Sequence, residues 1–133
     1  MILFKTILVA LFGALMAWII NQALIRLGFR GKQILAIFGP VVEETLKTGL
    51  ALIFKTPIIA VHVIFGLVEG LWEIVNKPHS IGPVMAAWGG HTFFGLLAYV
   101  SYNITEQSGI AWMSGLLAHL VWNRLILTLH HKP

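Results

Sequence analysis

Five long apolar segments, separated by short polar links, constrain the fold of this chain more than any other feature. A helix needs about 20 apolar residues to cross the hydrocarbon core of a bilayer. In hydrocarbon, only helices and closed barrels satisfy every backbone hydrogen bond. The pattern predicts an all-α, multi-pass membrane bundle of about five transmembrane helices, at Ile2–Ile25, Gln33–Phe54, Ile58–Val75, Val84–Tyr102 and Ile110–Leu129.

The composition agrees with a membrane protein and excludes several functions. Hydrophobic residues make up 58% of the chain and charged residues 11%, whereas a soluble domain carries about 25% charged residues. The sequence has no cysteine, which excludes disulfides and thiolate chemistry. The basic residues are scattered, so we expect the lipid bilayer and no nucleic acid as a partner. We expect residues 1–133 to form a single membrane-embedded domain, with the first segment spanning the membrane and not cleaved as a signal peptide.

The distribution of basic residues predicts an orientation. Lys and Arg are enriched on the cytoplasmic side of membrane proteins. With five spans, two basic residues fall on one side, Lys5 and Lys55. The other side collects the larger group and is predicted to be cytoplasmic: Arg26, Arg30, Lys32, Lys77, Arg124 and Lys132.

Ionisable side chains inside the predicted spans indicate a functional site. The second span contains "GPVVEETLKTGL", with two adjacent glutamates and a lysine near its middle. A charge at the centre of a membrane helix costs about 2.5–3.5 kcal/mol, so such groups usually face one another or a wet cavity. The polar residues within the spans are Glu43, Glu44, Lys47, His62, Glu69, Glu73, His91, His119 and Asn123.

Most of these residues share one depth. Counted from the predicted cytoplasmic ends, they lie roughly six to ten residues into their helices, or about 9–15 Å at 1.5 Å per residue. The shared depth predicts one site nearer the cytoplasmic face, formed by Glu43, Glu69, His91 and His119. His62 falls in the outer half and is interpreted as structural or interfacial, and Glu73 lies close to a helix end.

Two carboxylates, two histidines and a nearby amide can activate water. A glutamate in a medium of low polarity can act as a general base, and histidine or asparagine can donate hydrogen bonds to an oxyanion. Alternatively, Glu and His side chains can hold a divalent metal such as zinc with an open position for water. The zinc-protease motif HExxH is absent, and the chain has no aspartate for an aspartyl pair.

Four motifs on successive spans resemble those of an intramembrane protease superfamily. They are "EETLK" (Glu43–Lys47), "FGLVE" (Phe65–Glu69), the isolated His91, and "HLVWN" (His119–Asn123). The superfamily contains the type II CAAX prenyl endopeptidases, their bacterial Abi (CPBP) relatives and the PrsW proteases. The EExxK and FxxxE patterns are more similar to the PrsW branch, whereas the final asparagine is similar to the CAAX branch.

The resemblance implies an intramembrane endopeptidase that cleaves a membrane-anchored or lipidated substrate in a prokaryotic cell membrane. It implies that Glu43 activates water, that Glu44 or Lys47 tunes it, and that Glu69 occupies the second motif position. The catalytic residues it implies are Glu43, Glu44, Glu69, His91, His119 and Asn123; Glu69, His91 and His119 would hold the metal if one is used. Two alternative functions stay open at this point: a small proton- or cation-coupled transporter or channel, and a catalytically inactive membrane scaffold.

Overall fold

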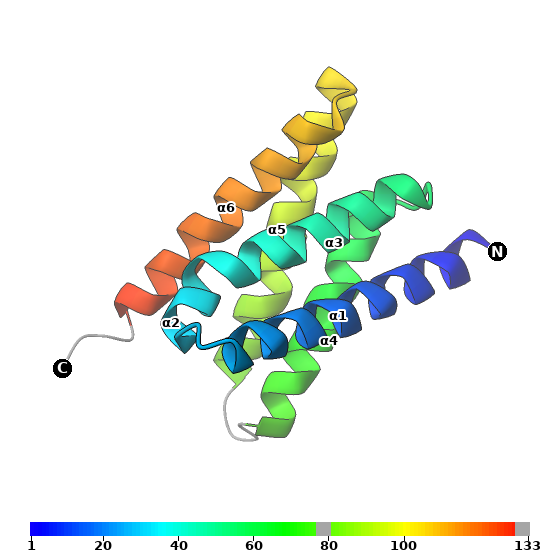
Figure 1. Ribbon diagram of the computed structural model, residues 1–133. Helices are drawn as coiled ribbons and strands as arrows, with labels where there is room; N and C mark the ends of the chain where they lie inside the picture. Colours follow the sequence, from blue (N-terminus) through cyan, green and yellow to red (C-terminus); the bar gives the residue numbers. More distant parts are fainter. Residues whose placement is uncertain (77–80, 130–133) are drawn as a thin grey trace.

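The computed structural model describes residues 1–76 and 81–129, and these form an all-α bundle without β-strands (Figure 1). The predicted fold class is confirmed. Four long helices are continuous and begin and end within a few residues of the predicted segments: α1 (Ile2–Arg26), α4 (Ile58–Asn76), α5 (Ile81–Thr105) and α6 (Ser108–Leu129).

The second predicted segment is one helical stretch with an irregular turn. It consists of α2 (Gly31–Gln33), the π-helical turn η1 (Ile34–Phe38) and α3 (Gly39–Ile53). The Gly39 N–H bonds to the Ile34 carbonyl, five residues back. Pro40 follows directly and has no N–H to continue an α-helical ladder, so the irregular turn lies where the ladder is already broken. This turn lies one helical turn before the glutamate pair.

Helix α3 occupies the middle of the bundle. It packs against α1, α4 and α6, while α5 packs between α4 and α6 (Figure 1). The buried residues are largely small or polar, including Ala10, Ala51 and Ala98 together with Glu44 and Lys47. Large apolar side chains instead cover the outside, as on the α1 face formed by Phe4, Leu8, Phe12, Leu15 and Trp18. This inverted distribution suits a chain whose surroundings are apolar.

Within residues 1–76 and 81–129, three helices are long and apolar enough to cross a membrane: α1, α4 and residues Ser108–Thr128 of α6. Their length and composition support a membrane protein. The two further spans and the orientation stay predictions. Lys77 and Lys132, two of the residues on which the orientation was argued, lie outside the described residues.

Candidate active site

The centre of the site is the Glu44 carboxylate, which is fully buried and accepts hydrogen bonds from three helices. The Lys47 Nζ lies 2.7 Å from Glu44 Oε1, and His119 Nδ1 on α6 lies 2.9 Å from the same oxygen. His62 Nε2 on α4 lies 3.0 Å from Glu44 Oε2. A buried carboxylate is costly unless it is paired and hydrogen-bonded, and these three donors meet that need.

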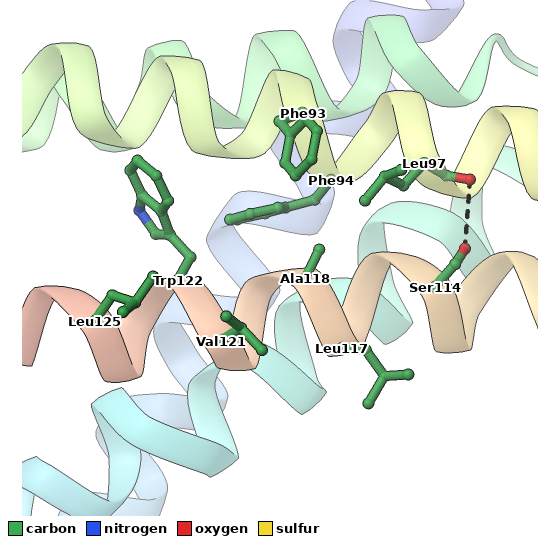
Figure 2. A pocket seen from close by; sticks show the side chains of 9 residues that line it. All are labelled: Phe93, Phe94, Leu97, Ser114, Leu117, Ala118, Val121, Trp122 and Leu125. Atoms are coloured by element: carbon green, nitrogen blue, oxygen red, sulfur yellow. Dashed lines mark hydrogen bonds between the residues drawn. The ribbon is translucent and has the colours of Figure 1, made fainter.

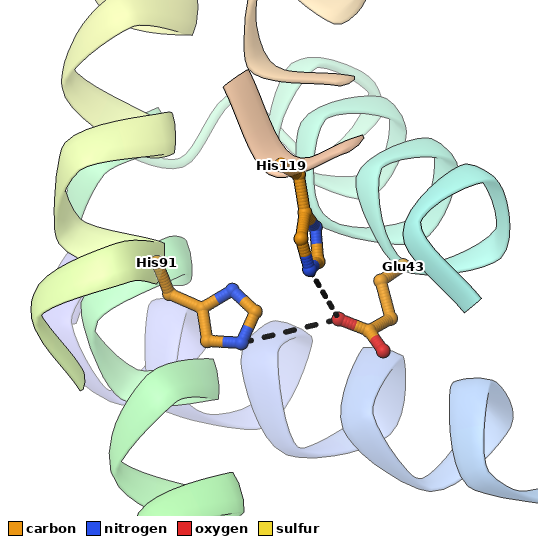
Figure 3. A group of neighbouring side chains, drawn as sticks. All are labelled: Glu43, His91 and His119. Carbon is orange, nitrogen blue, oxygen red and sulfur yellow. Dashed lines mark ion pairs between the residues drawn. The ribbon is translucent and has the colours of Figure 1, made fainter. Parts of the chain in front are cut away.

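The neighbouring Glu43 turns away from this centre and faces two histidines (Figure 3). Its Oε2 lies 3.9 Å from His91 Nε2 and 3.9 Å from His119 Nε2. Lys47 Nζ lies 3.4 Å from the same oxygen. One ligand atom from each of Glu43, His91 and His119 lies within 4.8 Å of the other two, so these three could hold a metal ion.

Lys47 also fixes the hydrogen positions of His91. Its Nζ lies 2.8 Å from His91 Nδ1. A lysine ammonium is only a donor, so Nδ1 accepts and the ring hydrogen of a neutral His91 sits on Nε2. That Nε2 contacts the Glu69 carboxylate. The Lys47 ammonium further lies 4.6 Å from the centroid of the Phe65 ring, close enough for a cation–π contact.

His119 is held in the complementary state. Because its Nδ1 lies 2.9 Å from Glu44, Nδ1 carries the hydrogen and Nε2 of the neutral ring is an acceptor facing Glu43. The ring stacks on Phe94 with centroids 4.6 Å apart and an angle of 20° between the planes. The His91 and His119 rings meet edge to face at 5.1 Å. His91 thus presents an N–H toward the Glu43 carboxylate and His119 presents an acceptor nitrogen, each 3.9 Å from Glu43 Oε2.

A groove of about 630 Å³ connects this cluster to the surface of the bundle. Glu43 and Glu69 lie in its lining, and their side chains are 15% and 42% exposed. Most of the remaining lining is apolar and comes from α1 and α4: Leu11, Ala14, Leu15, Ala17, Trp18, Phe65, Val68, Leu71, Trp72 and Val75.

A second groove of about 450 Å³ between α5 and α6 is lined without any of these ionisable groups (Figure 2). Its polar member, Ser114, donates to the carbonyls of Ala111 and Leu97 at 2.9 and 3.4 Å. The arrangement gives no nucleophile–base pair. The groove between α1 and α4 is therefore the one associated with the candidate site.

The structure brings most of the sequence-predicted site residues together. Glu43, Glu44, Glu69, His91 and His119 lie in one connected set of contacts. Asn123 is half-buried on α6, one turn beyond His119, and its role stays a prediction. The predicted metal set differs in one member: Glu43, and not Glu69, completes the close group with the two histidines. Within this group Glu69 contacts His91, and its side chain lines the groove.

His62, which the sequence indicates is structural or interfacial, joins the buried network. An interfacial position is excluded because the residue is fully buried, with Nε2 on Glu44 and Nδ1 3.0 Å from the Ile58 carbonyl. Both ring nitrogens face acceptors, so His62 satisfies both only with a hydrogen on each. Its position two helical turns before Glu69, on the same face of α4, was the signal that could have identified it.

Glycines leave the space that this cluster occupies. A Cβ on Gly95 would lie 2.5 Å from His62 Cβ and 2.7 Å from its Cγ. A Cβ on Gly115 would lie 2.9 Å from Glu44 Oε2, and one on Gly66 would lie 3.0 Å from His91 Cβ. Helices α4 and α5, and likewise α3 and α6, therefore approach closely enough for the buried polar groups to meet.

We expect Gly95→Ala to destabilise the protein by about 1–3 kcal/mol, because the methyl group overlaps a buried ring that has no free space. Gly89→Ala on the same helix is the matched control, since a Cβ there meets nothing within 4 Å. The control should be neutral or gain up to about 1 kcal/mol from helix propensity. Denaturant unfolding of both variants in micelles measures the difference. Equal stabilities for the two variants would contradict the packing described here.

No family model matches this sequence, and no curated protein or solved structure matches it either.

Proposed function

We propose that this protein is an intramembrane endopeptidase in which Glu43 activates water for attack on a peptide bond. The observation that carries the proposal is the convergence of Glu43, His91 and His119, from three helices, at the lining of an apolar groove. A carboxylate with two histidines is a usual set for general acid–base chemistry. The membrane-facing character of the helices supports a membrane-anchored or lipidated protein as substrate.

The two acceptors of the site suit a water molecule. Glu43 Oε2 and His119 Nε2 are 3.9 Å apart, and a water that donates one hydrogen to each would be oriented by both. Glu43 then takes a proton as the water oxygen bonds to the carbonyl carbon. Glu44 holds the His119 ring in place through Nδ1, much as a buried carboxylate orients a catalytic histidine elsewhere.

His91 supplies the donor that the developing oxyanion needs. Its Nε2–H contacts Glu69 in the resting arrangement, and Glu69 is the most exposed carboxylate of the cluster. We propose that this N–H turns to the oxyanion when Glu69 moves aside. The proton on Glu43 passes to the leaving nitrogen, the C–N bond breaks, and the products are a carboxylic acid and an amine.

The contact of Lys47 with His91 supports a mechanism without a metal. Ligation through His91 Nε2 needs a lone pair there, but the ammonium at Nδ1 favours the tautomer that carries hydrogen on Nε2. The donor set alone would suit zinc. The hydrogen-bond partners of the set do not fit it, so no step is assigned to a metal.

Cleavage of reporter peptides tests the proposal. A set of single-span peptides with a fluorophore and a quencher at opposite ends is reconstituted in bilayers with the purified protein. We expect at least one reporter to be cut, with the rate unchanged by a chelator. Loss of cleavage with the chelator and recovery with zinc would contradict the metal-free mechanism and favour the Glu43, His91 and His119 metal site.

One observation favours a second candidate, a proton-coupled transporter. His62 extends the chain of ionisable contacts from Glu44 to the Ile58 carbonyl, at the beginning of α4. Such chains occur in proton relays. Proton flux across sealed vesicles without any reporter cleavage would favour this function. Absence of both activities in folded protein would favour an inactive scaffold.

A further inference from the structure

Asn21 is a polar residue on α1, the long helix that carries none of the protease-like motifs. It lies in the lining of the groove between α1 and α4, together with Glu43 and Glu69. Apart from the ring nitrogens of Trp18 and Trp72, the polar side-chain groups in this lining belong to these three residues. Asn21 is five residues before the end of α1, and a leucine there would suit the apolar surroundings better.

The Asn21 side chain has a buried oxygen without a partner in the part of the chain that the structure describes. Its Oδ1 is buried and has no hydrogen-bond partner within residues 1–76 and 81–129. An unpaired buried carbonyl oxygen of this kind costs about 1–3 kcal/mol. If Asn21 had no function, a leucine in its place would avoid this cost. The asparagine is therefore expected to have a role.

Gly39 brings Asn21 close to the proposed base. A Cβ at Gly39 would lie 3.8 Å from Asn21 Nδ2 and 3.7 Å from Glu43 Oε1, so the two side chains flank the same bare stretch of backbone. That stretch begins directly after the π-helical turn. The carboxamide and the carboxylate therefore border one part of the groove, next to a residue that has no side chain.

We propose that Asn21 binds the backbone of the substrate beside the bond that is cut. This inference rests on the proposed endopeptidase function. A peptide bond can be attacked only in an unwound segment, whose N–H and C=O groups lack partners inside a mostly apolar groove. A carboxamide offers one acceptor and two donors, which match one peptide unit. The substrate class is accordingly an extended segment of a membrane-anchored polypeptide, recognised through its main chain.

The experiment uses any reporter that the native protein cuts and compares three variants. We expect Asn21→Leu to lower kcat/KM about tenfold, mainly through KM, because one hydrogen bond is lost on binding. Asn21→Gln keeps the carboxamide and should retain more of the activity. Gln22→Leu is the matched control, since Gln22 is the next residue of α1 and does not line the groove; it should cleave as the native protein does.

Ester substitution distinguishes binding from packing. Each amide near the cleavage site is replaced in turn by an ester, which has no N–H. The native protein should cut one ester about tenfold more slowly than the corresponding amide. The Asn21→Leu variant should cut that ester and the amide at similar rates.

Three results would overturn the proposal. The first is an unchanged kcat/KM in Asn21→Leu, and the second is the same ratio of ester to amide cleavage in native and Asn21→Leu protein for every ester. The third is unfolding of both Asn21 variants, which would assign the residue to packing. If the native protein cuts no reporter, the endopeptidase function fails and the role of Asn21 fails with it.

Discussion

Glu44→Leu is expected to lower the free energy of unfolding by about 3–5 kcal/mol, because it leaves the buried Lys47 ammonium without its closest partner. Lys47 is fully buried and lies 2.7 Å from Glu44 but 3.4 Å from Glu43. His62 and His119 lose an acceptor in the same step. Unfolding in denaturant, monitored by circular dichroism in micelles, measures the change.

A double variant separates the unpaired charge from the other losses. Glu44→Leu with Lys47→Met removes both charges and should regain a large part of the stability, because replacing a whole buried pair is often close to neutral. Glu69→Gln is the comparison for a carboxylate of the same cluster whose side chain is 42% exposed, and it should cost much less. Native stability in the Glu44→Leu single variant would contradict Glu44 as the centre of the buried network.

The helices could be predicted from the sequence because each is a nearly uninterrupted apolar run. The predicted Ile58–Val75 became α4 (Ile58–Asn76), and the predicted Ile110–Leu129 became α6 (Ser108–Leu129). Helix length against bilayer thickness is a strong constraint, and polar links end each run. The pairing of Lys47 with both glutamates was likewise predictable, since positions three and four apart are neighbours on a helix.

The roles of the two adjacent glutamates could not be separated from the sequence. Consecutive residues of a helix point about 100° apart, so one of the pair must face inward when the other faces the groove. Which one does so depends on the rotation of α3 against α1, α4 and α6. The structure has Glu44 buried in the bundle and Glu43 on the groove.

Contacts between segments distant in the chain also could not be predicted from the sequence. The apolar pattern of α1 is nearly uniform around the helix, so nothing in it indicates which face meets the groove or that Asn21 lies beside Glu43. His62 lies outside the predicted depth of the site, yet its ring contacts Glu44. Gly95 has no side chain, so α5 can pack against the His62 ring where the ring makes this contact. Close approach at glycines depends on the packed bundle, which the sequence pattern does not specify.

Glu43→Gln is the variant with the largest expected effect on activity. The amide keeps the size of the side chain and one acceptor for Lys47, which lies 3.4 Å away, but it cannot take a proton from water. Loss of general-base help costs roughly 10²–10⁴-fold in rate. Stability should change little, because Glu44 remains as the closer partner of Lys47. Glu73→Gln is the matched control on α4, since Glu73 does not line the groove, and it should stay close to native activity.

The role of Glu43 as the base is tested by the rate of reporter cleavage by native and Glu43→Gln protein, reconstituted side by side at equal folded concentration. We expect cleavage by the native protein and a loss of about a hundredfold or more in Glu43→Gln, with unchanged circular dichroism and thermal midpoint. Cleavage by Glu43→Gln at the native rate would remove Glu43 as the base and contradict the proposed mechanism.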